Sequence, residues 1–328
     1  MIRLFLIYSF LCLGCCAFAQ QPKYLLEGRA QGTTYRIIYQ HPTAVVQKQD
    51  IDSILHAIDL SMSIYKKESL ISSFNKATTR EIEMDGMMRD VVRRSFDINK
   101  QSKGMFDLTV KPLVSLWGFG PERIRQWPTQ GQIDSVMEFV GMDKLKVKGK
   151  RLLKKRNEVS IDVNGIAQGY SVDVLARFLD KQHVTSYMVE LGGEIKTKGR
   201  KEGGETYKVA IERPEGDVES SFVLSLFNKA VTTSGNYRKA FDVDGKKVHH
   251  HINPYDGYPL QNNIASVTVI AETAMDADAY DNVFMALPVA EGLKLANSIR
   301  NLELYIIYKE GDLFREAFST GFKKYIQE

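Results

Sequence analysis

The stretch over residues 160–173 constrains the fold of this chain more than any other. It reads SIDVNGIAQGYSVD: an apolar alternation ends at Asp162, two glycines follow, and from Tyr170 onward apolar residues recur at helical spacing. This pattern predicts a strand, a glycine-rich turn and a helix. Such a junction points backbone N–H groups and a helix N-terminus at one place, where a phosphate or another anion binds well. A plain strand-to-helix connection is the alternative explanation.

The first 19 residues differ in kind from the rest of the chain. Arg3 precedes an apolar run over 4–13, and small residues lead to Ala19. This is the pattern of a secretory signal cleaved before Gln20, and the apolar run is too short for a lasting membrane span. We therefore expect an exported protein whose folded part covers residues 20–328 as a single domain.

All three cysteines, Cys12, Cys15 and Cys16, lie inside this signal. The expected mature chain thus has no thiol for a disulfide or a thiolate metal site. Residues 13–16 partly resemble a lipoprotein processing site, so lipid attachment at Cys15 or Cys16 is the alternative to cleavage after Ala19. That alternative would anchor the protein to a membrane.

Composition predicts a globular protein and excludes some classes of function. The chain has 328 residues, of which 44% are hydrophobic, so it can bury a large core. Formal net charge is +4, and the one long basic block, over 146–156, reads as a solvated hairpin with Gly149 at its turn. Because that block has no interleaved aromatic residues, we expect no nucleic-acid binding.

Strand and helix patterns mix irregularly along the chain, which predicts a compact α+β fold rather than a doubly wound sheet. We expect strands over 24–30, 34–40, 185–191, 195–199, 207–212, 222–227, 230–233, 264–271, 302–309 and 313–319. We expect helices over 51–62, 87–101, 129–140, 274–287 and 289–299. Residues 63–75 and 249–259 read as irregular, and the aromatic- and glycine-rich run over 104–120 either fills a core or walls a pocket.

Two glycine-containing segments indicate that another group lies close to the backbone. Gly192 and Gly193 interrupt a region of strands, where paired glycines weaken a sheet unless something lies against it. Thr233, Ser234 and Gly235 read as a turn that gathers hydroxyl and N–H groups.

Three adjacent histidines, at 249–251, lie in a turn-rich loop. Neighbouring side chains of an extended chain point to opposite faces, so at most one face of this triplet enters a site. His250 suits general base work, or zinc ligation with distant partners. A plain surface loop is the alternative.

An acidic helix face offers oxygen ligands. Asp278 and Asn282 lie four residues apart, on one side of the expected helix, with Asp281 beside them. Mg²⁺ prefers one or two carboxylates together with the phosphates of a substrate. Taken alone, such a face is as well explained by solvation.

Nine motifs occur in an order that resembles the ApbE-type FAD:protein FMN transferases. They are GTTY at 32–35, MSIY at 62–65, SFN at 73–75, FD at 106–107 with LWGFG at 116–120, the stretch over 162–173, GGE at 192–194, TSGNY at 233–237, HHINPYDGYP at 250–259 and ADA at 277–279. Together they span nearly all of the expected mature chain. The resemblance implies a compact mixed-sheet α+β fold with a T-fold-like core.

The resemblance also implies an activity. Such an enzyme uses Mg²⁺ and takes FAD as its substrate, joins FMN through a phosphoester to a threonine hydroxyl of an acceptor protein, and releases AMP. It implies an exported protein, periplasmic and either soluble or anchored to the membrane as a lipoprotein. Its acceptors include subunits of membrane redox pumps and other extracytoplasmic flavoproteins.

The family pattern assigns roles to individual residues of this chain. His250 takes the proton of the incoming threonine, and the metal ligands are Asp278, Asn282 and the backbone carbonyl of Ala167. Backbone N–H groups approach the flavin and the phosphates, and Tyr65 lines the pocket while Asp162 supports the central turn. The residues assigned to cofactor binding are Tyr65, Asp162, Gly192, Gly193, Glu194, Thr233, Ser234 and Gly235. For Tyr65, a place in the core is the alternative.

The sequence departs from the family pattern in three places. Gln168 stands where lysine is frequent, and Asn282 stands where threonine is usual. Asn253, Tyr255 and Asp256 replace an Asp-Pro-Arg/Lys-Thr-Gly run, which removes a basic phosphate contact. These departures leave metal and phosphate binding open.

Two other functions remain alternatives at this point. A Mg²⁺-dependent FAD pyrophosphatase would use the same residues and give FMN and AMP. A periplasmic FAD-binding protein without catalysis would have little use for both His250 and Asp278.

Overall fold

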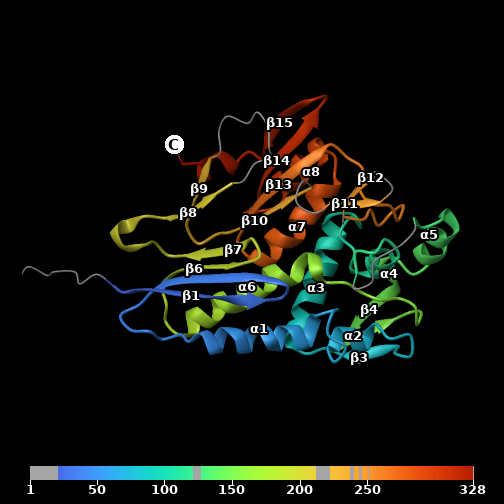
Figure 1. Cartoon of the computed structure of the whole chain (residues 1–328), viewed down its shortest axis with the longest axis horizontal. Helices are drawn as coiled ribbons and strands as arrows, with labels where there is room; N and C mark the ends of the chain where they lie inside the picture. The colour runs from blue at the N-terminus through green and yellow to red at the C-terminus, as the bar shows by residue number, and fades with distance from the viewer. Residues whose placement is uncertain are drawn as a thin grey trace, which may run out of the picture.

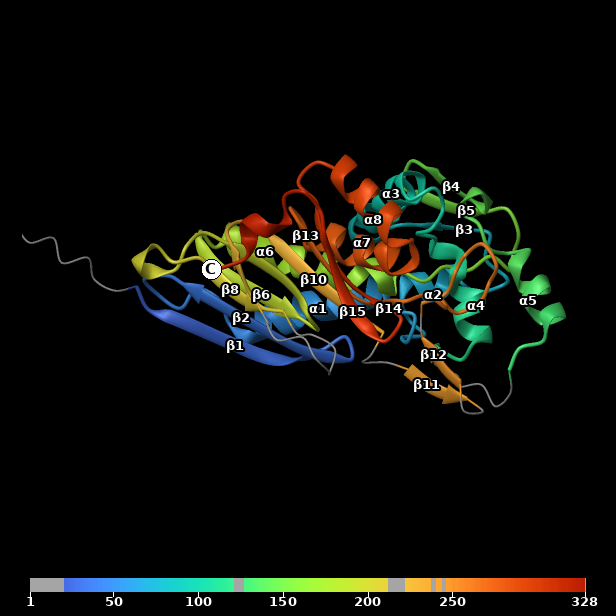
Figure 2. The same ribbon diagram turned by 90° about the horizontal axis from the view of Figure 1, so that it is seen from above.

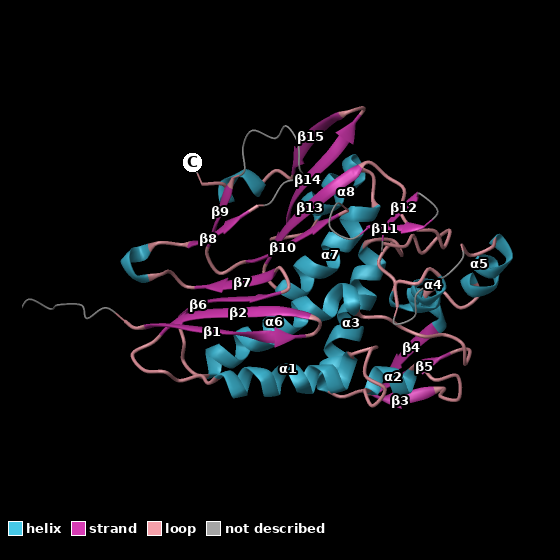
Figure 3. Ribbon diagram, viewed as in Figure 1, coloured by secondary structure: helices cyan, strands magenta, loops and turns pink. Residues whose placement is uncertain are grey.

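The computed structural model describes residues 21–120, 127–211, 222–236, 240–243, 246–249 and 251–327, the side chains of 240–243 and 246–249 excepted. Within these residues eight strands form one antiparallel sheet in the order β1-β2-β6-β7-β10-β13-β14-β15 (Figures 1 and 3). The strands are β1 (Lys23–Ala30), β2 (Thr33–Gln40), β6 (Ser186–Leu191), β7 (Glu194–Lys198), β10 (Ala230–Gly235), β13 (Ile264–Ala271), β14 (Glu303–Glu310) and β15 (Leu313–Phe318).

Helices cover one face of this sheet and form the main core. They are α1 (Lys48–Met62), α3 (Gly86–Gln101), α6 (Asn164–Lys181), α7 (Ala274–Ala286) and α8 (Val289–Ser298), as Figures 1 and 2 show. Because successive strand residues point to opposite faces, Tyr35, Ile37 and Tyr39 of β2 face the helices and are buried. The α6 and α7 helices lie side by side over the centre of the sheet.

The opposite face of the sheet is covered only in part. A hairpin of β8 (Tyr207–Ala210) and β9 (Val223–Leu226), with the 3-10 turn η4 (Phe322–Tyr325), packs over β10, β13 and β14. Val231, Tyr305 and Phe322 belong to this second apolar cluster. Leu25 of β1 remains 48% exposed, so the cover does not extend to that edge.

A smaller unit completes the described fold. It contains the sheet of β3 (Glu81–Glu83), β5 (Arg151–Lys154) and β4 (Leu145–Lys148), the helices α2 (Leu70–Phe74), α4 (Lys111–Leu116) and α5 (Gln130–Met137), the 3-10 turns η1 (Leu108–Val110) and η2 (Met142–Lys144), and the separate hairpin of β11 (Ala240–Val243) and β12 (Lys246–His249). A third 3-10 turn, η3 (Glu202–Gly204), precedes β8.

The aromatic run over 104–120 fills a core, as one of its two interpretations predicted. Trp117 is 5% exposed, and its indole N–H donates to the carbonyl oxygen of Gly257 at 2.7 Å. Leu113 and Ile133 pack in the same small apolar cluster. This contact attaches the loop around Gly257 to α4 and α5.

The prediction of an α+β fold is confirmed, but the segment that leads into α6 differs from the expectation. Residues 159–163 belong to no strand of the described sheets. The Asp162 N–H donates to the Leu108 carbonyl at 2.8 Å, and the Asn75 side chain both donates to and accepts from the backbone of Ile161 at 2.8 Å. Side-chain and loop contacts, which no periodicity reveals, hold this segment in place of a strand partner.

The two glycines of this stretch were also misassigned. The helix begins at Asn164, so Gly165 and Gly169 lie inside α6, and neither has a positive φ. Gly165 interrupts the helical geometry with φ −83° and ψ 18°. The prediction of a glycine-rich turn before the helix was therefore wrong.

The other two glycine-containing segments also lie in elements different from those expected. Gly192 and Gly193, with φ 68° and 114°, form the two-residue turn between β6 and β7, where Leu191 pairs with Glu194. A turn with two positive φ angles strongly favours glycine, so turn geometry accounts for both. Thr233, Ser234 and Gly235 lie in β10 and not in a turn.

Smaller differences concern element boundaries. Thr129 caps α5 as expected, but the helix ends at Met137 instead of continuing to residue 140. The irregular segment over 63–75 contains the short helix α2, and the strands β3, β11 and β12 were not expected. In the basic hairpin, Lys154 is buried and not solvated.

No helix among the described residues is long and apolar enough to cross a membrane.

Candidate active site

The contact between α6 and α7 is unusually close because of Gly169. A Cβ atom at this position would lie 2.2 Å from the Ala274 carbonyl oxygen and 2.7 Å from the Asp278 Cβ. The Gly169 N–H donates to Oδ2 of Asp278 at 2.8 Å. Glycine thus lets the first turns of α6 reach the buried carboxyl of α7.

Asp173 fixes the start of α7 against α6. Its two carboxyl oxygens accept hydrogen bonds from the N–H groups of Ala274 at 3.0 Å and Met275 at 2.9 Å. These groups would otherwise have no partner at the beginning of a helix. Asp173 therefore sets the position of α7 along α6, and with it the position of Asp278.

The carbonyl oxygen of Ala167 belongs to the same contact. It accepts a hydrogen bond from the Ser171 hydroxyl at 2.9 Å, one turn further along α6, and that hydroxyl lies 3.1 Å from Oε1 of Gln31 in the β1–β2 turn. Inside α6 the same carbonyl also accepts the helical hydrogen bond from the Ser171 N–H, so the Ser171 hydroxyl occupies the position that a ligand would take. Ala167 can offer its oxygen to a ligand between the two helices when the Ser171 hydroxyl donates to Gln31 instead.

Asn282 and Asp281 extend the cluster along α7. The Asn282 amide nitrogen donates to the Asp278 carbonyl at 2.9 Å, to Oδ1 of Asp281 at 2.8 Å and, more weakly, to the Gly165 carbonyl at 3.4 Å. Its carbonyl oxygen accepts no hydrogen bond from the described part of the chain. The side chain is thus anchored by its nitrogen, with its oxygen available.

Ser234 of β10 connects the sheet to this cluster. Its hydroxyl donates to Oδ2 of Asp281 at 2.9 Å. Thr233, the preceding residue, points to the other face of the sheet, where its hydroxyl lies 3.0 Å from that of Thr268. The structure therefore places the Ser234 side chain against the α7 carboxyls but not that of Thr233.

The turn of Gly192 and Gly193 lies beside the start of α6. A Cβ at Gly192 would lie 2.8 Å from Nε2 of Gln168, 3.0 Å from the Thr33 methyl group and 3.1 Å from Oε2 of Glu194. The β6–β7 turn, the β1–β2 turn and α6 thus meet here. Gln168 occupies this junction with a neutral amide.

Burial dominates the electrostatics of the α7 carboxyls. It raises the pKa of Asp278 to about 7; the Gly169 hydrogen bond opposes this rise and the charge of Asp173 adds to it. Burial, and then the charge of Asp278, raises the pKa of Asp281 well above its ordinary value, and Glu194 adds to that effect. The two aspartates penalise each other's ionised form, which a bound cation would relieve.

The donor set fits a hard divalent cation. Ala167 offers a carbonyl oxygen, Asn282 an amide oxygen, and Asp278 a carboxyl oxygen, Oδ1, that accepts no hydrogen bond from the described residues. No three or more His, Cys, Asp or Glu side chains converge as a metal cluster in the described part of the chain. Mg²⁺, with few carboxylate ligands and the rest from water or phosphate, suits this set better than Zn²⁺.

Tyr65 and Asp162 lie at the N-terminal end of α6. Oδ1 of Asp162 accepts the N–H of Asn164 at 2.8 Å, so this carboxyl supports the start of the helix. Tyr65 is 60% exposed, which excludes the alternative of a core aromatic. Partial burial, and then the Asp162 charge, raises the pKa of its hydroxyl. Tyr65 is therefore an accessible aromatic ring beside the site.

The structure thus gathers most of the predicted site around the first turns of α6. His250 lies outside the described residues, so its place in the site stays a prediction. Sequence reasoning gave no role to Asp173, although the hydrogen bonds of Asp173 position the cluster. Asp281 was noted only as a neighbour; its spacing of three from Asp278 was the available signal.

Comparisons with known proteins show the family of this chain. The profile of the ApbE family matches residues 31–306. The chain belongs to the ApbE family. A relative from Haemophilus influenzae, a FAD:protein FMN transferase, is 37% identical over 91% of this chain and 90% of its own length. One from Vibrio cholerae, with the same name, is 36% identical over 92% of both chains.

Solved structures of ApbE proteins share the fold. The flavin transferase ApbE from Vibrio cholerae superposes with a TM-score of 0.85 at 33% identity, covering 93% of this chain and 99% of that one. The apo flavinyl transferase ApbE from Pseudomonas stutzeri gives 0.85 at 31% identity, over 94% and 98%. The α+β fold of the flavin transferases is therefore the fold of this chain, and its described main sheet is antiparallel.

Proposed function

We propose that this chain is a FAD:protein FMN transferase that moves FMN from FAD to a threonine hydroxyl of an acceptor protein and releases AMP. The observation that carries the proposal is the close α6–α7 contact, which sets oxygen donors of Ala167, Asp278 and Asn282 beside the β6–β7 turn. Membership of the ApbE family supports it.

The residues of the site have distinct parts in this reaction. Mg²⁺, held by Asp278, Asn282 and the Ala167 carbonyl, would neutralise charge on the pyrophosphate of FAD. The β6–β7 turn and the start of α6 would lie against the phosphates, and Tyr65 offers an aromatic surface to the flavin.

The chemical step replaces a phosphoanhydride bond of FAD with a phosphoester bond to threonine. His250 accepts the proton of the threonine hydroxyl, whose oxygen forms a bond to the phosphorus of the FMN half. The bond from that phosphorus to the bridging oxygen breaks, and the oxygen leaves with AMP. The pyrophosphate bond is thus broken and one phosphoester is made, with no redox change.

We further propose that the enzyme is exported and acts in the periplasm, soluble or held to the membrane through lipid at Cys15 or Cys16. The signal-like pattern of the first 19 residues supports export. Its acceptor would be an extracytoplasmic flavoprotein, such as a subunit of a membrane redox pump.

A histidine substitution tests the proposal. We expect His250→Ala to lower the transfer rate by about 10² to 10⁴-fold, since a positioned general base contributes that much. FAD binding, measured by flavin fluorescence, should stay within about twofold, because the substitution leaves the described cofactor contacts in place. The transfer is followed by the mass of the acceptor.

His249→Ala is the matched control, because it removes an adjacent histidine and leaves the assigned base, His250, in place. It should retain transfer. Equal activity of His250→Ala and the native enzyme would show that another group takes the proton.

A further inference from the structure

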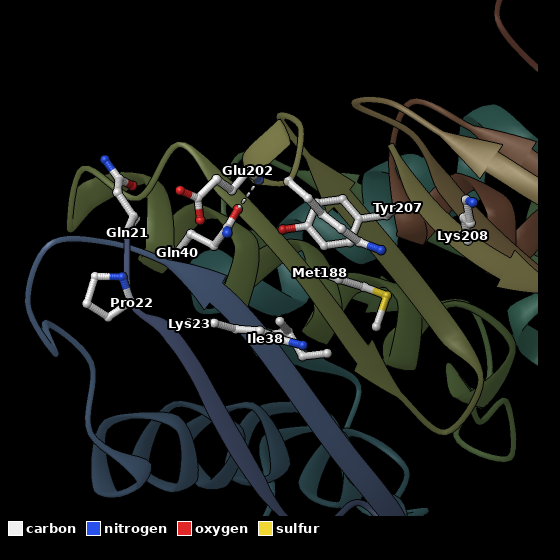
Figure 4. Close-up of a pocket in the computed structure, with 10 residues that line it drawn as sticks. Gln21, Pro22, Lys23, Ile38, Gln40, Met188, Glu202, Tyr207 and Lys208 are labelled. Atoms are coloured by element: carbon white, nitrogen blue, oxygen red, sulfur yellow. Dashed lines mark hydrogen bonds between the residues drawn. The ribbon is translucent and has the colours of Figure 1, made fainter. Parts of the chain in front are cut away.

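A cavity of about 640 Å³ opens at the end of the sheet opposite the candidate active site (Figure 4). Strand β6 shows the separation: Ser186 begins it, next to the cavity residue Tyr207, and Leu191 ends it at the β6–β7 turn. Five residues of strand cover about 17 Å. The cavity is therefore separate from the site that binds FAD in the proposed function.

The cavity is basic at its rim and apolar at its floor. Ile38 and Met188 come from the uncovered face of β2 and β6, and the rim carries Lys23, Lys201 and Lys208. Glu202 is the one acidic side chain in the lining. None of the three lysines forms an ion pair within the described residues. Three unneutralised ammonium groups around an apolar floor favour an anionic, partly apolar partner.

Exposed apolar side chains lie at the same end of the sheet. Phe227, in the turn between β9 and β10, is 44% exposed, and the Arg200 guanidinium lies 4.9 Å from its ring centroid. Leu25, which pairs with Ile38 across β1 and β2, is 48% exposed. A mixture of basic groups with an exposed aromatic ring is typical of surfaces that meet the headgroup region of a membrane.

The start of the described chain lies at this cavity. Gln21 and Pro22 line it and lead into Lys23 (Figure 4). Cys16 precedes Gln21 by five residues, a distance of at most about 18 Å even when the chain is fully extended. If Cys15 or Cys16 carries lipid, a membrane lies within reach of the cavity.

We propose that this end of the sheet, formed by Lys23, Lys201, Lys208, Phe227 and Leu25, faces a membrane and binds the headgroups of anionic phospholipids. The lysines meet the lipid phosphates, and the two apolar side chains sit at the level of the headgroups. A lysine near an anionic surface increases partitioning by roughly fivefold. Three such residues orient a protein that is already tethered, while the untethered protein binds weakly.

This arrangement has a geometric consequence for the proposed function. The candidate active site lies at the far end of β6 and β7, so it would open away from the bilayer. An acceptor threonine would then have to stand above the membrane by about the length of these strands. The membrane surface itself does not depend on the transferase activity, and its test uses a different readout.

The test measures sedimentation with lipid vesicles. The full chain carrying Cys15→Ser and Cys16→Ser, which cannot be lipidated, is exported, purified and mixed with vesicles of phosphatidylcholine alone or with about one third phosphatidylglycerol. We expect binding to the anionic vesicles only, and loss of that binding when salt rises from about 50 to about 500 mM.

Charge reversal locates the surface. Lys23→Glu, Lys201→Glu and Lys208→Glu together should lower partitioning at least about tenfold, with FMN transfer in solution unchanged. The matched control reverses Lys146, Lys148 and Lys150 of the β4–β5 hairpin, which are exposed and lie in the smaller unit, away from β1 and β2 (Figure 1). This control should bind the vesicles as the parent does.

Three results would overturn the proposal. They are equal binding to neutral and anionic vesicles, no binding to either, and loss of binding in the hairpin control but not in the cavity variant. If the parent protein binds anionic vesicles but transfers no FMN, that result would contradict the proposed function and leave the membrane surface standing.

Discussion

Asp278 combines two properties that a metal ligand needs. It is buried against α6, and its Oδ2 is held by the Gly169 N–H, so its orientation is fixed before any ligand arrives. Its Oδ1 accepts no hydrogen bond from the described residues. The side chain thus resembles a preformed half of a cation site.

Asp278→Asn should separate metal binding from folding. The amide keeps the shape of the carboxyl and still accepts from Gly169, but it loses the charge that attracts Mg²⁺. We expect the Mg²⁺ concentration for half-maximal transfer to rise at least about tenfold. Calorimetry with Mn²⁺ and bound FAD should show the same weakening. A Mg²⁺ titration identical to that of the native enzyme would exclude Asp278 as a ligand.

Gly169 is required by packing and not by a turn. Gly169→Ala would place a methyl group 2.2 Å from the Ala274 carbonyl oxygen, so α6 and α7 must separate. We expect the free energy of unfolding in urea to fall by about 1–3 kcal/mol.

Gly131→Ala in α5 is the matched control, because a Cβ there meets nothing within 4 Å. Alanine is the better helix former by up to about 1 kcal/mol, so this variant should be as stable as the native protein or more so. If the two alanine variants are equally stable, α6 and α7 can separate at Gly169 at little cost, and the packing requirement for glycine is contradicted.

At the scale of elements, the β4–β5 hairpin is attached through a buried cation. Lys154 is 4% exposed, and its ammonium group donates to the carbonyl oxygens of Phe74 at 2.9 Å, Val159 at 3.0 Å and Lys76 at 3.1 Å. Burial lowers the pKa of Lys154 from 10.5 to about 8, and the charge of Glu158 opposes this shift. The hairpin thus carries a group that titrates differently in the folded and unfolded chain.

This difference predicts a pH dependence. Between pH 8 and 10.5 the unfolded chain holds a proton on Lys154 that the folded chain has lost. Stability therefore gains a contribution as pH rises through that window. Lys154→Met should remove this contribution, so the native protein gains stability relative to the variant from pH 7.5 to 9.5. Urea unfolding at both pH values measures the difference in free energy of unfolding between the native protein and the variant. If that difference is the same at both pH values, the lowered pKa of Lys154 is contradicted.

The helix α6 shows where sequence reasoning succeeded and where it failed. The apolar spacing from Tyr170 to Leu179 correctly predicted a helix, because burial against the sheet imposes that period. The start was misplaced, since the glycines were interpreted as a turn. What they permit is contact with α7, a partner more than 100 residues away in the chain. Spacing within one segment carries no information about such a partner.

At the scale of the whole molecule, the order of the motifs predicted the family and the fold, while long-range contacts decided the site. Asp278 and Gly169 meet because α7, which packs on β7, β10 and β13, lies beside α6, which packs on β6 and β7. Ser234 joins Asp281 because alternation in β10 turns it inward. The same alternation turns Thr233 to the opposite face. The sequence pattern predicted a turn at this position, and a turn does not predict such alternation. Residue types indicated the chemistry, and the sheet determined which side chains meet.

The antiparallel sheet also separates two surfaces. One end carries the α6–α7 cluster and the glycine turn, and the other carries the lysine-rimmed cavity next to the start of the described chain (Figures 1 and 4). The proposed active site and the proposed membrane surface can therefore change independently in this architecture.

The most direct test of the central claim is a transfer assay. Purified protein, FAD, Mg²⁺ and an acceptor domain bearing a flavinylation threonine are combined, and the acceptor is analysed by intact mass. The account predicts a gain of one FMN per acceptor, abolished by EDTA and absent when the threonine is replaced by alanine. An unchanged acceptor with FAD split to free FMN and AMP, or with FAD left whole, would contradict it.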